Sequence, residues 1–352
     1  MRDPWLDNVK YVLVTFVVMG HALPLAHLDT TLDAQLYDFI YSWHIPAFVL
    51  ITGYFSRGFR WSRRHLSALV TGLLIPYLIF ESVMRQANIH WSDQQVQGPY
   101  LLNPGWPMWY LVATMLWRLA SPVLRKHWLM LPASIVASLG FGMIDADWTD
   151  WFDLSRVVGL LPFFVFGLLV KPEHLALLKR PWAPAVGVVV LLLTWTLAGR
   201  TDDWISTRWL WYAFPYSMLR ADGVQVDNLT GAMLRLGVMA VGFVAALAVL
   251  SLVPRKQHWF TPLGAATLVV YLFHGFVIRV AWALDFPQWA QSQGGWVLAL
   301  VLLAAIGVST VLAAPPIASR LSWLIDPVTE LRRRRERRTR NAEPPSAASL
   351  RG

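Results

Sequence analysis

The sequence predicts an all-α fold, a polytopic integral-membrane helical bundle of about ten transmembrane helices with both termini cytoplasmic. Three observations lead to this prediction. Of the 352 residues, 56% are hydrophobic and 14% are charged, whereas a soluble domain carries about 25% charged residues. Long apolar runs recur along the chain. Basic residues are abundant in every second loop between those runs and scarce in the others.

Ten apolar runs predict the ten helices. Most approach the roughly 20 residues that a helix needs to cross a bilayer. The first run has a weakly charged flank and nine more follow it, so we expect a retained helix and not a cleaved signal peptide. The sixth and seventh runs are short, which predicts thin, tilted or partly interfacial helices. The runs are residues 9–26, 39–55, 66–83, 106–124, 128–144, 157–170, 183–198, 231–253, 262–283 and 296–317.

The loop charges predict the orientation. With a cytoplasmic N-terminus, the four cytoplasmic loops hold eleven basic residues and the five outer loops hold four. Positive charge is enriched in cytoplasmic loops, so we expect a multi-pass protein of the cell membrane with both ends in the cytoplasm. The cytoplasmic set is Arg57, Arg60, Arg63, Arg64, Arg125, Lys126, Lys171, Lys179, Arg180, Arg255 and Lys256, and the outer set is Arg85, Arg200, Arg208 and Arg220.

The chain divides into a membrane-embedded domain, residues 1–325, and a basic, disordered cytoplasmic tail, residues 326–352. The net charge is +9, and seven arginines lie between Arg332 and Arg340, directly after the last run. A basic cluster in this position fixes topology and contacts anionic headgroups. We therefore expect membrane lipids, and not nucleic acid, as the partner of this segment.

Composition also excludes several chemistries. The chain has no cysteine, which rules out disulfides, thiolate nucleophiles and Cys-ligated zinc. It contains no glycine-rich phosphate loop and no serine nucleophile elbow. We expect no metal site.

Lys10 and His21 form the most informative pair in the chain. His21 follows Lys10 by eleven positions in one apolar run, and eleven steps of about 100° return to nearly the same helical face, roughly 16 Å further along. Ionisable residues inside membranes are costly and usually functional. We expect a polar tunnel that is basic near Lys10 and lined by imidazole near His21.

Short motifs then follow one another in a fixed order. The opening segment contains an arginine, then Asp-Asn-x-Lys, then an apolar run that ends in Gly-His. The second run contains His-x-Pro-x-Phe and, later, Thr-Gly-Tyr. The residues concerned are Arg2, Asp7, Asn8, Lys10, Gly20, His21, His44, Pro46, Phe48, Thr52, Gly53, Tyr54, Pro76, Tyr77, Trp109, Tyr110, Phe163 to Gly167, Tyr271 and His274.

In this order the motifs resemble the acyltransferase-3 family, particularly its fucose 4-O-acetylase-like branch, over about residues 2–325. Two features depart from the family pattern. Thr52 replaces the usual serine before the glycine. The basic residues that members usually place just before the third-run proline are absent from residues 66–75, and the nearest are Arg63 and Arg64.

The resemblance implies an O-acyltransferase, usually an O-acetyltransferase. Its donor substrate would be cytosolic acetyl-CoA and its acceptor a sugar hydroxyl on a glycan, a cell-envelope polysaccharide or a glycosylated metabolite. An alcohol that attacks a thioester must lose its proton, and histidine suits that role at neutral pH. We expect His21 to be the general base or, alternatively, an acyl relay. His44 is a second catalytic candidate, and His44, Tyr110 or His274 would supply oxyanion donors.

Donor binding requires positive charge, because coenzyme A is polyanionic. Lysine and arginine both bind phosphate. The candidates are Lys10, Arg57, Arg60, Arg63 and Arg64; the alternative for the arginines is a topological role alone. Asp7 lies three residues before Lys10 and either orients or neutralises it.

Further candidates have two interpretations each. Glu81 either orients a histidine or links helices. Arg156 either neutralises an acidic acceptor or pairs with Asp153. His274 has a site role or a packing role, and Arg118 and Arg279 snorkel towards the interface. The aromatic residues between Trp204 and Tyr216 form an interfacial belt or, alternatively, stack on sugar rings.

One other class of protein fits the same features. A transporter or flippase that relays protons through intramembrane histidines would also place ionisable residues inside the bundle. Inverted repeats with broken helices would favour transport, and the sequence shows no such repeat.

Overall fold

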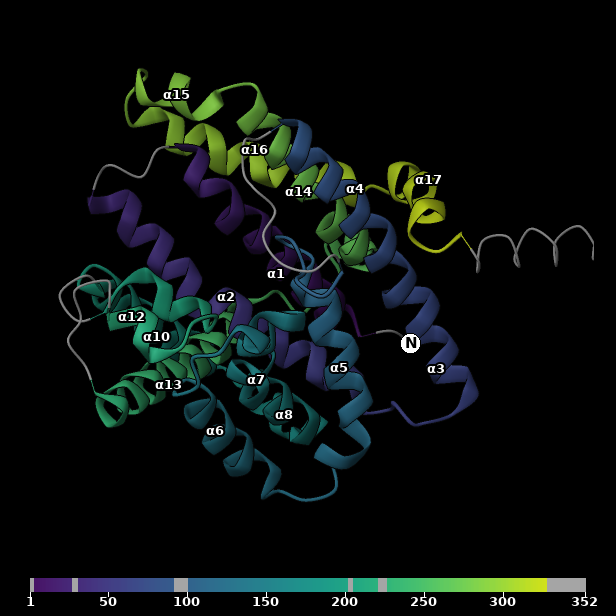
Figure 1. Ribbon diagram of the computed structural model, residues 1–352, viewed down its shortest axis with the longest axis vertical. Coiled ribbons are helices and arrows are strands. Elements are labelled where there is room, and N and C mark those ends of the chain that lie inside the picture. Colours follow the sequence, from purple (N-terminus) through teal and green to yellow (C-terminus); the bar gives the residue numbers. More distant parts are fainter. Residues whose placement is uncertain (1–2, 27–30, 92–100, 202–204, 221–226, 328–352) are drawn as a thin grey trace, which may run out of the picture.

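The computed structural model describes residues 3–26, 31–91, 101–201, 205–220 and 227–327. Over these residues the secondary structure is helical, with no strand (Figure 1). The all-α prediction is therefore confirmed. Residues 328–352, with the arginine cluster of the predicted tail, lie outside the described residues.

All ten predicted runs lie in helices. The first is α1 (Pro4–Ala22), continued by η1 (Leu23–Ala26), and the second is α2 (Thr31–Ser56). The third joins α3 (Arg63–Leu69), a π-helical segment η2 (Val70–Leu74) and α4 (Ile75–Trp91). The others are α5 (Trp109–Leu124), α6 (Met130–Phe141), α7 (Leu154–Gly159) with α8 (Leu161–Leu169), α10 (Ala183–Ala198), α13 (Asn228–Leu252), η5 (Thr261–Ala266) with α14 (Thr267–Ala283), and α16 (Trp296–Ala313).

Shorter helices connect these elements. They are η3 (Asp147–Asp153), α9 (Pro172–Leu177), η4 (Thr207–Trp211), α12 (Tyr216–Arg220), α15 (Phe286–Gln291) and α17 (Pro315–Ile325). The tenth run was predicted to continue to residue 317, but α16 ends at Ala313 and Pro315 begins α17. Proline is accepted at the first position of a helix and breaks one from inside, which explains the earlier end.

Among the described residues, five helices are long and apolar enough to cross a membrane, or six if the bent pair Asp147–Gly159 and Leu161–Leu169 counts as one span. The helices α6 and α10 are apolar but short. Helix α2 has 26 residues, and the buried polar side chains Asp38, Ser42 and His44 lower its overall hydrophobicity. Several membrane-crossing helices are consistent with a polytopic bundle, while the count of ten and the cytoplasmic termini stay predictions.

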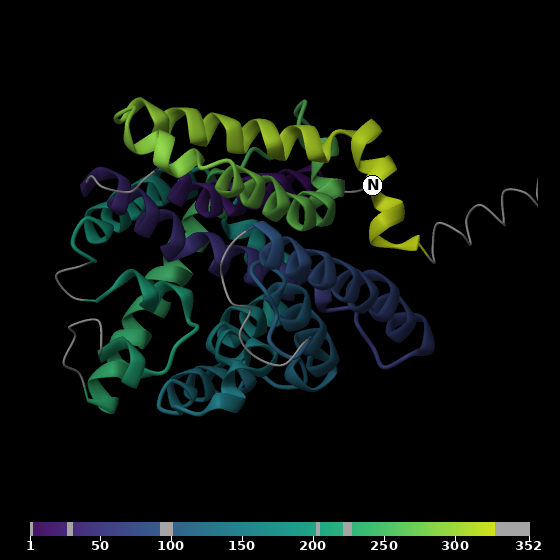
Figure 2. The ribbon, with the colours of Figure 1, turned by 45° about the horizontal axis from the view of Figure 1, so that its top comes forward.

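The centre of the bundle is formed by α1 and α2. Helix α1 packs against α2, α14, α16 and η5, and α2 packs against α8, α10 and α13. In Figure 2, α16 lies across α14 along one side of the molecule. Two glycines bring α2 and α8 together: a Cβ on Gly53 would lie 2.1 Å from the carbonyl oxygen of Phe164. One on Gly167 would lie 2.0 Å from that of Leu50. Small residues permit such close approach of membrane helices.

Asn8 fixes the position of α1. Its side chain is fully buried, and its amide nitrogen donates to the carbonyl oxygens of Pro254 (2.8 Å) and Lys256 (2.9 Å). Its amide oxygen accepts a hydrogen bond from Thr261 at 2.6 Å. Pro254 and Lys256 lie in the loop after α13, and Thr261 is the first residue of η5. The Asp-Asn part of the opening motif thus ties the start of α1 to a distant loop and sets where Lys10 and His21 lie in the bundle.

Candidate active site

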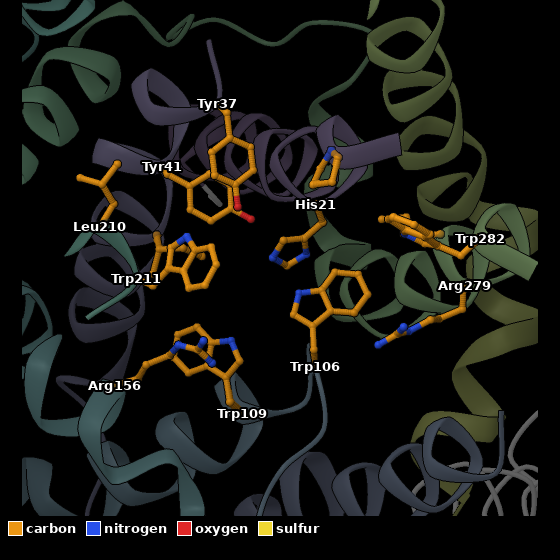
Figure 3. Close-up of a pocket in the computed structure, with 13 residues that line it drawn as sticks. His21, Tyr37, Tyr41, Trp106, Trp109, Arg156, Leu210, Trp211, Arg279 and Trp282 are labelled. Atoms are coloured by element: carbon orange, nitrogen blue, oxygen red, sulfur yellow. The ribbon is translucent and has the colours of Figure 1, made fainter. Parts of the chain in front are cut away.

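A cavity of about 690 Å³ lies beside the C-terminal end of α1 (Figure 3). We call it the His21 cavity. Its walls come from six helices and from the loop before α5. The lining residues are His21, Pro24, Tyr37, Tyr41, Ile45, Trp106, Trp109, Arg156, Leu210, Trp211, Ile278, Arg279 and Trp282.

His21 is hydrogen-bonded to His274 on α14. Nδ1 of His21 lies 2.8 Å from Nε2 of His274, and the two rings stack at 5.1 Å between centroids. Nδ1 of His274 lies 2.6 Å from the carbonyl oxygen of Tyr271. A carbonyl only accepts, so Nδ1 of His274 carries a proton and its Nε2, in the neutral ring, does not.

This arrangement assigns the tautomer of His21. Because Nε2 of His274 is an acceptor, Nδ1 of His21 must donate to it. Nε2 of a neutral His21 then has a free lone pair, on a side chain that lines the cavity. A second residue that holds an imidazole in one tautomer is the logic of catalytic triads. The arrangement leaves His21 ready to accept a proton from a bound hydroxyl.

His44 lies next to this pair but does not line the cavity. It is fully buried, and its Nδ1 lies 2.8 Å from the carbonyl oxygen of Ile40, one turn earlier in α2. Its Nε2 has no hydrogen-bond partner among the described residues and faces Gly20, where a Cβ would lie 3.4 Å away. His44 therefore packs on the backbone of α1 directly before His21.

Trp106 and Trp109 form one wall of the cavity. The ring of Trp106 lies edge-on to His21 at 4.8 Å between centroids. Glu81 holds the loop that carries Trp106, since both of its carboxylate oxygens accept the backbone N–H of Gly105, at 3.0 and 2.9 Å. The structure thus places Glu81 against this loop.

Arg156 and Arg279 also face the cavity, with the two tryptophans between them (Figure 3). Arg156 forms an ion pair of 2.6 Å with Asp153 and lies 5.3 Å from the ring centre of Trp109. Arg279 lies 5.4 Å from the ring centre of Trp106. Both interpretations of Arg156 are therefore compatible with the structure, because it is paired and also lines the site.

A second cavity, of about 240 Å³, lies beside Lys10. We call it the Lys10 cavity. Thr52, Tyr110 and Arg118 give it a polar side, and the hydroxyl groups of Thr52 and Tyr110 are hydrogen-bonded to each other. Its full lining is Lys10, Leu13, Phe48, Ile51, Thr52, Phe55, Gly72, Leu73, Tyr110, Leu111, Thr114, Arg118, Thr267, Leu268 and Tyr271.

Lys10 and Asp7 form an ion pair at this cavity. The ammonium group lies 2.6 Å from a carboxylate oxygen of Asp7 and 5.6 Å from the ring centre of Phe55. The predicted contact between the two residues is present. Lys10 therefore reaches the cavity with its charge partly balanced by its own helix.

The four predicted donor-binding arginines lie between the end of α2 and the first turn of α3. Arg57 follows Phe55 at the end of α2, donates to the carbonyl oxygens of Tyr54 (3.1 Å) and Val170 (2.9 Å), and stacks on Tyr54. Arg60, Arg63 and Arg64 are exposed in and after the following loop. None of the four lines either cavity. The structure instead brings Arg118 to Lys10.

The two cavities have no lining residue in common. Aromatic side chains lie where the two cavities adjoin. Trp109 lines the His21 cavity, whereas its neighbour Tyr110 lines the Lys10 cavity and contacts Tyr271 at 5.5 Å between ring centroids. The described residues thus line two adjoining cavities, one beside His21 and one beside Lys10.

Several lining residues were not singled out by sequence reasoning as site residues. Thr114 and Arg118 are among them, although they follow the predicted site residue Tyr110 at spacings of four residues on α5. One helical face carries all three, and this polar stripe was a usable signal. Trp106 lies in a loop, and Arg279 does not share the helical face of His274. No helical spacing could have identified these two.

No group of three or more histidine, aspartate or glutamate side chains could hold a metal ion among the residues that the structure describes. The polar groups on the residues that line the two cavities are imidazole, hydroxyl, indole N–H, ammonium and guanidinium groups.

Two comparisons with known proteins bear on this geometry. The acyltransferase-3 family model, described as an acyltransferase domain, matches residues 3–314. The chain is also similar to the nodulation protein NolL of Sinorhizobium fredii (strain NBRC 101917 / NGR234). The identity is 25% over 339 residues, which cover 87% of this chain and 86% of that protein. No solved structure matches the chain.

Proposed function

This chain belongs to the acyltransferase-3 family, and from that premise we propose the reaction that it catalyses. It is an integral-membrane O-acyltransferase that moves an acetyl or other short acyl group from cytosolic acyl-CoA to a hydroxyl of a sugar, glycan or glycosylated metabolite. The observation that carries the proposal is the His21–His274 hydrogen bond of 2.8 Å, which leaves a basic nitrogen in a cavity large enough for a sugar.

In this mechanism the acceptor hydroxyl lies against Nε2 of His21. The imidazole takes the hydroxyl proton as the oxygen attacks the thioester carbonyl carbon. The new C–O bond forms, the C–S bond breaks, and the imidazolium returns its proton to the departing thiolate. Burial disfavours an isolated imidazolium, but Nδ1–H of His21 keeps its acceptor on His274 throughout. His274 is thus a positioning residue. A relay in which Nε2 of His21 first accepts the acyl group uses the same lone pair.

Oxyanion stabilisation falls to Tyr110 in this proposal. Nδ1 of His44 is directed to a backbone carbonyl, and both ring nitrogens of His274 have partners. The Tyr110 hydroxyl lines the Lys10 cavity. Because the Thr52 hydroxyl donates to the carbonyl oxygen of Phe48, Tyr110 donates to Thr52 in the empty site and would turn its O–H from Thr52 to the substrate oxyanion. A donor aimed at the developing negative charge is among the largest contributions to acyl-transfer catalysis.

The Lys10 cavity takes the acyl-bearing arm of the donor, and in this proposal the thioester carbonyl extends past Tyr110 to the hydroxyl that lies beside His21. At about 240 Å³ it is below the roughly 300–1,000 Å³ of typical ligand pockets, so it holds only part of acyl-CoA. Lys10 and Arg118 supply positive charge there. Arg57, Arg60, Arg63 and Arg64 follow the cavity wall at Phe55 and would meet the nucleotide phosphates outside it.

The test uses membranes that contain the full chain, labelled acetyl-CoA and the carbohydrate fraction of the same cells. We expect base-labile label in carbohydrate, and about 10²- to 10⁴-fold less for His21→Ala at equal expression. His127→Ala is the matched control, because His127 is exposed in the loop before α6, and it should transfer label like the unaltered chain.

Two outcomes would contradict the proposed function, and a third would distinguish the two routes of transfer. Label transfer that is unchanged in His21→Ala would remove the proposed base. No transfer, together with uptake of an unacetylated sugar that survives His21→Ala, would indicate a transporter in place of a transferase. Recovery of acetyl-imidazole on His21 after rapid quenching would favour the relay over direct transfer.

A further inference from the structure

The His21 cavity carries more positive charge than the proposed base needs. Arg156 and Arg279 both line it, from α7 and α14, and no carboxylate is among its lining residues. Figure 3 shows the two guanidinium groups on either side of Trp109 and Trp106. A neutral sugar would need hydrogen bonds but no such pair of cations.

Arg279 is the less balanced of the two. Arg156 shares its charge with Asp153, but Arg279 has no ion-pair partner among the described residues, and its Nε is buried without a hydrogen bond. Its contact with Trp106 satisfies none of its N–H donors. The side chain as a whole is partly buried, and a buried donor without an acceptor costs free energy. The side chain is therefore in a state that a bound anion would stabilise.

The rest of the wall has the chemistry of a saccharide site. Trp106, Trp109 and Trp211 present aromatic rings, and Tyr37 and Tyr41 present hydroxyl groups. Aromatic side chains offer large, rigid contact area together with a polar end. A guanidinium binds carboxylate or phosphate through two parallel hydrogen bonds. One ligand that meets all of these groups is a sugar ring with an anionic substituent.

We propose that the His21 cavity binds an anionic saccharide, with a carboxylate or phosphate held by Arg279 and Arg156 and a free hydroxyl directed to His21. The inference rests on the proposed function, since it names the class of acceptor for that reaction. It adds specificity: the two arginines select charged over neutral sugars. Arg279 is a binding residue in this account and takes no part in proton transfer.

The experiment measures binding without acyl-CoA. The full chain is placed in nanodiscs of phosphatidylcholine, and the Kd values of methyl glucoside, methyl glucuronide and methyl glucoside 6-phosphate are measured by calorimetry. We expect the two anionic glycosides to bind about 10- to 100-fold more tightly than the neutral one. Arg279→Gln should remove most of that preference, and Arg279→Lys should keep part of it. Arg320→Gln, an exposed arginine on α17, should change nothing.

Equal affinity for the neutral and anionic glycosides would overturn the inference, and so would a preference that Arg279→Gln leaves intact. If Arg279→Gln does not fold, the inference is tested by Arg156→Gln and by the Kd values of the neutral and anionic glycosides for the unaltered chain. Competition by phosphatidylglycerol added to the nanodiscs would assign the anion site to a lipid headgroup and would also overturn it. Anionic preference without label transfer would count against the proposed function alone, and transfer to neutral sugars without that preference would count against this inference alone.

Discussion

The two cavities share four helices but differ in size and chemistry. The His21 cavity measures about 690 Å³ and is walled by tryptophan, tyrosine and two arginines. The Lys10 cavity measures about 240 Å³ and is lined mostly by aliphatic and aromatic side chains, with Lys10 and Arg118 as its cations. Helices α1, α2, α5 and α14 contribute to both. In the proposed function, the larger cavity binds the acceptor, which can differ in size, and the smaller cavity binds the thioester arm of acyl-CoA, which does not.

Among the variants considered, His274→Leu should lower the rate of transfer at the His21 cavity the most. It removes the acceptor of the Nδ1–H of His21, so the base is no longer held in one tautomer. We expect turnover to fall by about 10²- to 10⁴-fold, with little change in either Michaelis constant. The measurement is steady-state transfer by purified protein. His274→Gln, which keeps a carbonyl acceptor, should recover part of the rate, and equal rates for the two variants would contradict the positioning role.

Tyr110→Phe tests the point where the two cavities adjoin. The ring and its packing remain, and only the hydroxyl next to Thr52 is lost. If that hydroxyl stabilises the oxyanion, turnover should drop by about 10²- to 10³-fold. Thr52→Val removes the other member of the same hydrogen bond and serves for comparison. A rate that falls with Thr52→Val but not with Tyr110→Phe would show that the pair has a structural role only.

Lys10→Gln and Arg118→Gln should show which substrate each cavity binds. Each removes a charge from the Lys10 cavity, so the Michaelis constant for acyl-CoA should rise by about 10- to 100-fold. The constant for the acceptor should stay within about twofold, because neither residue lines the His21 cavity. A rise for the acceptor instead would reverse the assignment of donor and acceptor to the cavities.

The smallest effect is expected for the exposed arginines. Arg60→Gln, Arg63→Gln and Arg64→Gln remove solvated charges, and exposed charge pairs contribute roughly 0–1 kcal/mol. Each change should raise the donor Michaelis constant by less than about fivefold, and the effect should disappear at high salt. A larger effect that persists at high salt would place the donor phosphates on these side chains directly.

The sequence allowed the helices and the Lys10–His21 axis to be predicted, because helical periodicity and apolar length are local properties. Both side chains face cavities inside the bundle, as their shared stripe suggested. The bond between His21 and His274 joins residues far apart in the chain, so no spacing could reveal it. The same holds for Glu81 and Gly105, and for Asn8 and the loop after α13. The count of membrane-crossing helices was less accessible, since α6 and α10 are apolar without being long.

Trp109 and Tyr110 are adjacent in the chain and yet face different cavities. Insertion of one residue before them would turn both by about 100° and place Trp109 in the direction that Tyr110 now has. Along α5, therefore, the linings of the two cavities are coupled. The η4 segment lines only the His21 cavity, through Leu210 and Trp211, so we expect new acceptor preferences to arise there first.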